Sequence, residues 1–362
     1  MKKITHIVNS LNPSGAEKML LRLLSAYKAK ETTSFQIIVL SSNFDQSFLL
    51  EFKKIVEDIH VIPSKSMLMK IFHVKKIIKS VRPDLIQTWM YEADVIGGIA
   101  GILTKTKVIW NVRSIRPANH SLLYLQIIGI LSWIIPHKII SNSKRAIAFK
   151  KKNFYNIDKF VYIPNGYDFD SITSSNSILD KSHMDITFGN VSRFDKTKGL
   201  NFLFEAIAEL QKNNIFPHFK FFGKGMTTEN TELVQMIAQH GMLTKNIEFN
   251  GFIKSTDVIF NSFDVLCQSS VTESFPNVII EGAMYGKIIL STKTGDLETI
   301  LKNTNYLCET HSAYQISSLI KKILKTDNNL LVNISKNNIK LSKSYNIDKI
   351  ATEYYELYSN II

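Results

Sequence analysis

The sequence predicts an α/β fold with two parallel-sheet domains. Short apolar runs alternate with loops and amphipathic segments along the chain, an order typical of parallel sheets covered by helices on both faces. This pattern occurs twice, and a polar run with six serines and threonines, residues 170–183, separates the two sets. With 362 residues, 45% of them hydrophobic, the chain is long enough to build two ordinary cores.

The first set begins with a strand at residues 4–8, the loop Leu11-Asn-Pro-Ser-Gly15 and a helix at residues 16–28. Its further strands are predicted at residues 35–40, 60–62, 85–88, 108–112 and 139–141. The second set has predicted strands at residues 185–191, 219–222, 247–250, 265–268 and 287–291. The turn signal Pro164-Asn165-Gly166 precedes the polar run. We therefore expect domains at residues 1–168 and 185–345, with a linker at residues 169–184.

A last amphipathic helix is predicted at residues 346–362. Its apolar residues include Ile350, Tyr354 and Tyr358, which recur at helical spacing. The periodicity predicts the helix but does not show where it docks.

Composition indicates a protein of a reducing compartment. Two cysteines, Cys267 and Cys308, are too few for a disulfide framework. The first residues lack an apolar core long enough for a signal peptide, which favours a cytoplasmic location. The most apolar stretch, residues 122–136, contains Gln126 and Ser132 and is shorter than the ~20 residues that span a bilayer. It predicts a buried or interfacial helix.

Basic residues are concentrated in the first half. Residues 1–168 hold 25 Lys and Arg against 11 Asp and Glu, whereas the whole chain holds 44 and 31. Apolar residues accompany the charge at helical spacing in the segments 65–79 and 144–155, which suits an anionic membrane surface. Insertion is expected at Met67, Ile71, Phe149 and Phe154. The alternative is that these are solvated faces of ordinary core helices. No nucleic-acid-binding motif accompanies the charge.

Two carboxylates eight residues apart frame a predicted loop-to-helix junction. Glu273 precedes Pro276, which suits the first turn of a helix, and Glu281 follows about one turn later. A helix start can bind phosphate, and ionised carboxylates accept hydrogen bonds from sugar hydroxyls. The alternative is a pair of solvated helix-end glutamates.

Two cations flank another such junction. Arg193 and Lys198 lie in the loop after the first strand of the second set, directly before Gly199 and a predicted helix. Cations at the end of a strand could hold a diphosphate and neutralise a departing nucleotide in place of a metal. The alternative is a pair of surface cations beside Asp195.

The order of these residues resembles that of family 4 retaining glycosyltransferases, over nearly the whole chain. The stretch from Glu273 to Glu281 is similar to their Glu-x7-Glu signature, with Phe-Pro-Asn after the first glutamate. Arg193 and Lys198 are similar to their Arg-x4-Lys-Gly motif. The loop ending at Gly15 resembles their glycine loop, with Ser14 in place of the first glycine. The resemblance implies the GT-B fold, in which two Rossmann-like domains face each other across a cleft and the last helix crosses back to the N-terminal domain.

The resemblance also implies roles for individual residues. Glu273, Arg193 and Lys198 would be catalytic: Glu273 would hold the donor sugar, and the two cations its diphosphate. Glu281 would hold the ribose, and the strand ends near Gly251 would bracket the base. The full set of expected donor-binding residues is Gly15, Arg193, Lys198, Gly251, Phe252, Glu273, Phe275, Pro276, Asn277, Val278 and Glu281.

The first half departs from the family pattern at two places. Arg113 stands where many members have a histidine, and an arginine cannot act as a base, so it could bind phosphate or an acceptor. Residues 87–98 resemble a subgroup that builds bacterial surface polysaccharides, with Glu92 at the usual histidine position. Glu92 and Asp94 could contact the acceptor or be helix-start residues. His120 is a further acceptor-side candidate or a loop histidine.

No metal or other cofactor is expected. Asp168-Phe-Asp170 could be taken for a metal-binding Asp-x-Asp, but it follows Pro-Asn-Gly at the domain boundary and is interpreted as linker. The predicted activity is transfer of a sugar from a nucleotide diphosphate sugar, expected to be UDP-linked, to a lipid-linked or polysaccharide acceptor at the inner face of the membrane. The alternatives are a nucleotide-sugar epimerase of the same fold and a non-catalytic nucleotide-binding scaffold.

Overall fold

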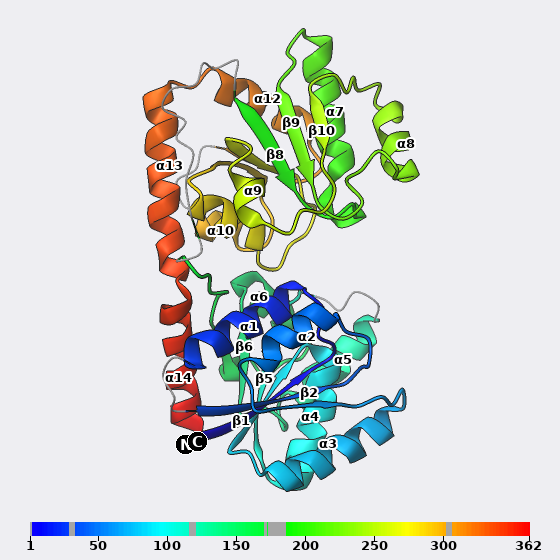
Figure 1. Cartoon of the computed structure of the whole chain (residues 1–362), viewed down its shortest axis with the longest axis vertical. Helices are drawn as coiled ribbons and strands as arrows, with labels where there is room; N and C mark the ends of the chain where they lie inside the picture. The colour runs from blue at the N-terminus through cyan, green and yellow to red at the C-terminus, as the bar shows by residue number, and fades with distance from the viewer. Residues whose placement is uncertain (1, 29–32, 116–120, 170–171, 173–185, 302–305) are drawn as a thin grey trace. The chain divides into compact units, whose positions relative to one another are not determined.

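The computed structural model describes residues 2–28, 33–115, 121–169, 172, 186–301 and 306–362 (Figure 1). The chain divides into two compact units. The first unit comprises Met1–Asp168 together with Tyr345–Ile362, and the second comprises Phe169–Ser344. Each unit is built on one parallel sheet.

The sheet of the first unit has the strand order β3-β2-β1-β4-β5-β6-β7, and all its pairs are parallel. Its strands are β1 (Lys2–Val8), β2 (Thr33–Val39), β3 (Asp58–Val61), β4 (Leu85–Trp89), β5 (Lys107–Val112), β6 (Lys138–Ser141) and β7 (Phe160–Tyr162). The direction of winding reverses between β1 and β4. The central strands are buried along nearly their whole length, as expected for a parallel sheet covered on both faces.

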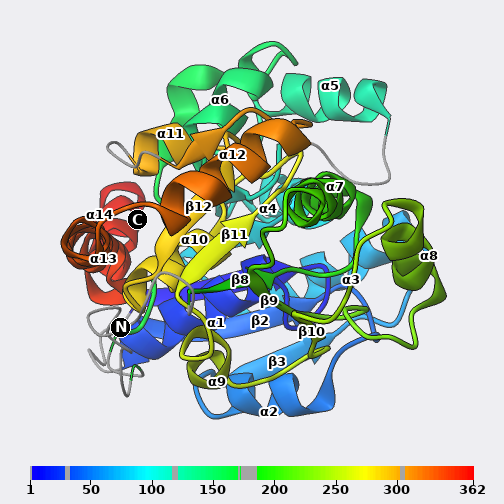
Figure 2. The same ribbon diagram turned by 90° about the horizontal axis from the view of Figure 1, so that it is seen from above.

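Helices cover both faces of this sheet. They are α1 (Gly15–Lys28), α2 (Gln46–Lys53), α3 (Met67–Val81), α4 (Tyr91–Thr104), α5 (Leu122–Leu131), α6 (Lys144–Lys151) and α14 (Ile347–Ile361), with the short η1 (Ile157–Lys159) before β7. One apolar core contains residues of α1, α2 and α14, and a second contains residues of α3, α4 and α5. Helix α5 lies at the periphery of this unit, with α6 next to it (Figure 2).

The last helix belongs to the first unit, as the GT-B fold implies. Ile350, Tyr354 and Tyr358 of α14 are buried in the same core as α1. Tyr354 Oη accepts a hydrogen bond from Asn111 Nδ2 at 3.2 Å, and Tyr358 Oη donates to the side chain of Gln87. The two chain ends therefore lie side by side, as Figure 1 shows.

The second unit has the strand order β10-β9-β8-β11-β12-β13, again all parallel. Its strands are β8 (Thr187–Val191), β9 (His218–Phe222), β10 (Ile247–Phe249), β11 (Val265–Gln268), β12 (Ile288–Thr292) and β13 (Leu307–Cys308). Its helices are α7 (Leu200–Lys212), α8 (Thr231–Gln239), α9 (Thr256–Phe260), α10 (Asn277–Met284), α11 (Leu297–Ile300), α12 (Ala313–Leu324) and α13 (Asn328–Ser342), with short turns η3 (Lys196–Lys198) and η4 (Lys343–Tyr345). Winding reverses between β8 and β11.

The predicted α/β class with two parallel sheets is confirmed. Each strand expected from the sequence is present, with ends shifted by a few residues at most. Two short strands, β7 and β13, were not predicted, because three and two residues are too few to show a pattern. Most of the expected linker lies outside the described residues. No helix in the described ranges is long and apolar enough to span a membrane.

Candidate active site

The loops after β8 and β11 meet at the point where the second sheet reverses its winding. In open parallel sheets, ligands bind at the carboxyl ends of the strands at such a reversal, because the following loops diverge there. The loop after β8 carries Arg193 and Lys198, and the loop after β11 carries Glu273. The parallel topology thus brings together residues that are 75 positions apart.

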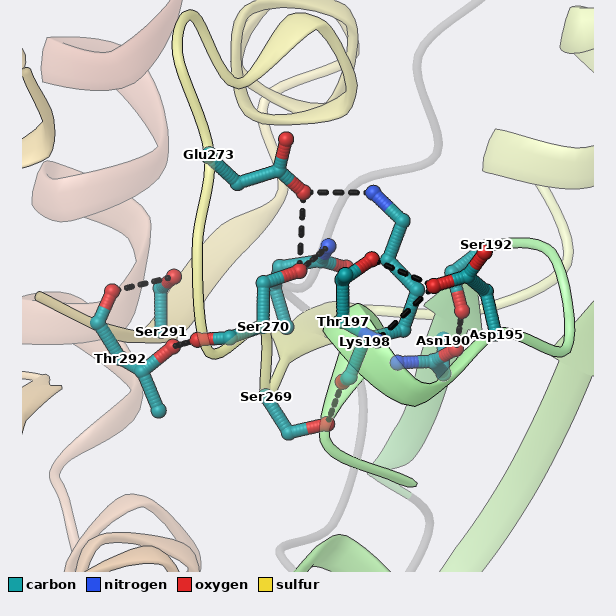
Figure 3. Close-up of polar contacts among 11 residues, drawn as sticks. Asn190, Ser192, Asp195, Thr197, Lys198, Ser269, Ser270, Glu273, Ser291 and Thr292 are labelled. Atoms are coloured by element: carbon teal, nitrogen blue, oxygen red, sulfur yellow. Dashed lines mark hydrogen bonds and ion pairs between the residues drawn. The ribbon is translucent and has the colours of Figure 1, made fainter. Parts of the chain in front are cut away.

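Lys198 and Glu273 form an ion pair. Lys198 Nζ lies 2.6 Å from Glu273 Oε1, and the two side chains are 19% and 17% exposed (Figure 3). The pair is therefore neither fully solvated nor closed off. An ammonium has three donors and a carboxylate accepts several hydrogen bonds, so each group can bind a ligand while keeping its partner.

Neighbouring polar residues hold Glu273 in place. Ser270 Oγ donates to Glu273 Oε1 at 2.9 Å and accepts from Gln268 Nε2 at 2.6 Å (Figure 3). The hydroxyl of Thr292, at the end of β12, donates to Ser270 O at 2.5 Å. The motifs did not indicate Gln268, Ser270 or Thr292. Their position at or just after the ends of two predicted strands was the signal that could have found them.

Two glycines allow the loops to approach each other closely. Gly199 has φ +60°, and a Cβ there would lie 2.2 Å from Ser269 O. Gly295 has φ +55°, and a Cβ there would lie within 3 Å of the backbone oxygens of Glu273 and Ser274. A side chain at either position would be strained and would collide with backbone. Gly199 therefore lets the loop that carries Lys198 approach the loop after β11, and Gly295 lets the loop after β12 approach the backbone of Glu273.

Arg193 lies at the start of the loop after β8, with an exposed side chain. Asp195 follows it, and hydrogen bonds from the Thr197 amide and hydroxyl hold the pKa of Asp195 below its usual range. Asp195 is therefore an anion engaged with the turn that leads to Lys198. Arg193 is available to solvent at the same strand end.

Helix α10 begins one residue later than predicted, at Asn277, with Pro276 as its N-cap. Phe275 and Pro276 are buried, whereas Asn277, Val278 and Glu281 are half-buried. The start of α10 thus follows Glu273 by only a few residues. Ser274 Oγ and Gln268 Oε1 are buried and have no hydrogen-bond partner among the described residues. This strand end therefore has hydrogen-bonding atoms that the described residues do not use.

The loops after β9 and β10 are joined by their backbones. Gly223 N donates to Gly251 O at 2.7 Å, and Gly251 N donates to Met226 O at 2.8 Å. Phe252, the next residue, has an exposed ring. Gly251 and Phe252 therefore lie at the same edge of the sheet as Arg193.

In the first unit, Arg113 follows β5 and is buried. It donates hydrogen bonds to Tyr354 Oη of α14 at 2.5 Å and to Asn165 Oδ1, and its guanidinium lies 4.9 Å from the ring of Trp89. Through its two terminal nitrogens the guanidinium fastens α14 to the sheet, whereas Arg113 Nε is buried without a hydrogen-bond partner among the described residues.

Asp94 is also buried, on α4. Its carboxyl group accepts a hydrogen bond from Thr88 Oγ1 at 2.5 Å, and burial raises its pKa to about 8. Burial lowers the pKa of Lys150 to about 7, and Lys150 Nζ donates to Tyr91 Oη and Ile115 O. Lys150 thus holds the loop after β5 through its hydrogen bond to Ile115 O.

The remaining candidates of the first unit are Gly15, Glu92 and His120. Gly15 begins α1, after a turn in which Ser14 N donates to Asn12 O. Glu92 forms an ion pair with Lys70 at 2.6 Å, and its side chain is 44% exposed. His120 and Asp170 lie outside the described residues.

A family model matches most of the second unit. Residues 172–341 match the family model described as "Glycosyl transferases group 1". This match lies in the second unit, and it confirms the resemblance to glycosyltransferases that the motifs there indicate.

Similar proteins span the whole chain. A protein of Campylobacter jejuni subsp. jejuni serotype O:2, "GalNAc-alpha-(1->4)-GalNAc-alpha-(1->3)-diNAcBac-PP-undecaprenol alpha-1,4-N-acetyl-D-galactosaminyltransferase", is 24% identical over 383 residues, covering 100% of this chain and 99% of the relative. The structure of Anabaena Alr3699/HepE in complex with UDP and glucose is similar with a TM-score of 0.84 and 20% identity, covering 99% and 100% of the two chains. A glycosyltransferase from Rickettsia africae has a TM-score of 0.81 and 18% identity, covering 99% and 98%. These structures share the GT-B fold.

Proposed function

We propose that this protein transfers a sugar, with retention, from a nucleotide diphosphate sugar to a lipid-linked saccharide in the synthesis of a bacterial surface polysaccharide. The observation that carries the proposal is the Lys198–Glu273 pair at the winding reversal of the second sheet, with Arg193 on the same loop as Lys198. The cation can bind a phosphate and the carboxylate can accept hydrogen bonds from sugar hydroxyls, which are neighbouring groups in a sugar diphosphate.

The proposed roles follow from charge and position. Arg193 and Lys198 bind the diphosphate and neutralise the charge that develops when the bond to the sugar breaks. Glu273 accepts hydrogen bonds from the donor sugar, held there by Ser270. Glu281 binds the ribose. Gly15 and the backbone of residues 275–278 contact phosphate or sugar oxygens, and Gly251 with Phe252 brackets the base.

Retention in this proposal proceeds by front-side attack. The bond between the anomeric carbon and the leaving phosphate breaks, the acceptor oxygen bonds to the same face of that carbon, and the leaving phosphate takes the acceptor proton. Arg193 and Lys198 stabilise the phosphate as its charge grows. No metal or other cofactor takes part, because the two cations supply the positive charge.

The acceptor side of the proposal rests on the first unit. The Campylobacter relative carries undecaprenol diphosphate in its name, which supports a lipid-linked acceptor here. The UDP in the Anabaena structure supports a UDP-linked donor. Glu92 is the acceptor-side candidate with a partly exposed side chain, whereas Arg113 and Asp94 are engaged with the fold. We place the enzyme at the inner face of the cell membrane, held by the basic first unit.

A donor screen tests this proposal. Nucleotide released from each of several UDP- and GDP-sugars is measured with and without a lipid extract containing saccharide acceptors. We expect release from one UDP-sugar that depends on the extract. Conversion of the donor sugar without any acceptor would instead identify an epimerase, and binding without turnover would identify a scaffold.

A further inference from the structure

Helix α5 presents apolar side chains to solvent as well as to the core. Leu125 and Ile128 are buried in the core of the first unit. Leu123, Ile127 and Ile130, on the other side of the helix, are 64%, 49% and 57% exposed. A surface helix usually carries polar residues on its outer face. The outer face of α5 is therefore unusual for a helix that contacts only water.

The turn after α5 extends this face. Trp133 and Ile134 are 59% and 76% exposed, and Trp133 Nε1 donates to Phe154 O at 2.8 Å, beside the exposed Phe154 ring. We call these residues the α5 apolar surface: Leu123, Ile127, Ile130, Trp133, Ile134 and Phe154. Contiguous exposed apolar residues of this kind mark interaction sites.

The surface is held rigidly. A Cβ at Gly129 would lie 2.0 Å from Asn153 O, so the helix packs directly on the segment that carries Phe154. Ser132 Oγ accepts from Asn156 N at 2.9 Å, and Lys159 Nζ donates to Trp133 O at 2.7 Å. The apolar side chains are thus displayed by a fixed helix.

Positive charge accompanies the α5 apolar surface. The segment 121–160 contains seven Lys and Arg residues and one acidic residue, Asp158. Lys151 and Lys152, shortly before Phe154 in the chain, are exposed, as are Lys144 and Arg145 of α6. An apolar face accompanied by basic side chains is complementary to an anionic bilayer.

We propose that the α5 apolar surface inserts into an anionic phospholipid bilayer, with α5 lying in the plane of the membrane. This inference rests on the proposed function and names the element that attaches the enzyme. It differs from the sequence prediction, which placed insertion at Met67, Ile71, Phe149 and Phe154. Ile71 and Phe149 pack against the core, so only Met67 and Phe154 of that set are exposed.

A bilayer suits this surface better than a second copy of the chain. A symmetric dimer places the same patch of both copies face to face. The basic residues of α6 and of the segment before Phe154 would then face their own copies, and like charges repel. Anionic headgroups attract the same residues instead.

The test is flotation of the full chain with vesicles of phosphatidylglycerol and phosphatidylcholine, at low and high salt. The variant Ile127→Gln/Ile130→Gln should weaken binding by roughly 10-fold or more, because two exposed apolar side chains no longer leave water. The control Leu68→Gln/Phe72→Gln alters two apolar residues of α3 that are at least as exposed as Ile127 and Ile130. It should bind like the unaltered protein. Equal loss in both variants, or loss in the control alone, would overturn the assignment to α5.

Tryptophan fluorescence gives a second readout that does not depend on a folding-sensitive variant. Trp89 and Trp110 are buried, so Trp133 is the tryptophan whose surroundings can change on docking. Adding anionic vesicles should shift the emission to shorter wavelength, and Trp133→Phe should abolish the shift while flotation persists. Flotation of the unaltered protein without any shift would overturn the inference and leave membrane attachment intact. Absence of flotation would overturn both, whereas transfer to a water-soluble acceptor would still test the glycosyltransferase assignment.

Discussion

Charged side chains follow the strands of both sheets, but the two units use them differently. In the second unit, Lys198 and Glu273 pair at a strand end where each is nearly one-fifth exposed. In the first unit, Arg113 and Lys150 are buried and donate to groups of the protein itself. The charged pair of the second unit thus stays accessible to a ligand. In the first unit, Arg113 instead fastens α14, and Lys150 fastens the loop after β5.

This difference shows that a charged residue after a parallel strand is not by itself a ligand-binding residue. Burying a charge is costly unless the protein supplies partners. Arg113 has such partners in Tyr354, Asn165 and the ring of Trp89. The comparison therefore predicts that substitutions in the second unit change activity, while those in the first change stability.

The largest expected effect is on transfer. Arg193→Ala and Lys198→Ala should each lower the rate by at least ~100-fold, the scale for losing an electrostatic contact in the transition state. Stability should change little, because Arg193 is exposed and Lys198 is partly exposed. Steady-state transfer rates and thermal unfolding measure the two effects.

The control for this prediction is Lys293→Ala. Lys293 is a cation of the same unit that lies outside both sequence motifs and pairs with Glu309 at 2.7 Å. It should retain transfer. Near-normal rates in either the Arg193 or the Lys198 variant would remove the assignment of that residue to the diphosphate.

Arg113→Ala should act on stability. Removing the guanidinium leaves Tyr354 and Asn165 without a charged partner and should lower the free energy of unfolding by about 2 kcal/mol. Urea unfolding followed by tryptophan fluorescence reports on the first unit, because Trp89, Trp110 and Trp133 all lie there. Arg145→Ala, at an exposed position on α6, is the matched control and should be neutral. A loss of transfer with unchanged stability would place Arg113 on the acceptor side after all.

Asp94→Asn should change the pH dependence of stability. Burial raises the pKa of Asp94 from 3.8 to about 8, so the folded state holds a proton that the unfolded state releases. The contribution to stability is complete below the unfolded pKa and is lost as pH rises toward the folded pKa. Between about pH 5 and about pH 7, the unaltered protein should lose roughly 2 kcal/mol relative to Asp94→Asn.

The window from about pH 5 to about pH 7 avoids an opposing contribution of Lys150 to the pH dependence of stability. The folded pKa of Lys150 is lowered to about 7, so the unfolded state binds more protons above that pH and stability rises there. Lys150→Met should remove only the rise in stability above about pH 7. Parallel pH curves for the unaltered protein and Asp94→Asn would show that Asp94 is ionised in the folded state.

The smallest expected effect is that of chelation. Transfer should survive EDTA unchanged, because Arg193 and Lys198 supply the positive charge that a metal would otherwise provide. The assay compares rates with EDTA alone and with EDTA followed by manganese. Full loss that manganese restores would show that a metal takes part, and Asp168-Phe-Asp170 would then be the first place to look.

The sequence by itself determined the fold class and the motif residues of the second unit. Strand, loop and helix signals are local, so short apolar runs and turn residues suffice to place them. The resemblance assigned Arg193, Lys198 and Glu273 to one donor, which agrees with the shared edge at which the carboxyl ends of parallel strands lie. Lys198 and Glu273 do lie 2.6 Å apart.

Only the tertiary structure decided which charged and apolar residues are exposed and can therefore contact a ligand or a membrane. Arg113 and Asp94 have the residue types of a binding site, but burial and partners on α14 and β4 engage them. The apolar segment 122–136 could be buried or interfacial by sequence, and the outer face of α5 proved exposed. Composition and spacing record what a side chain is, whereas its exposure depends on elements distant in the chain.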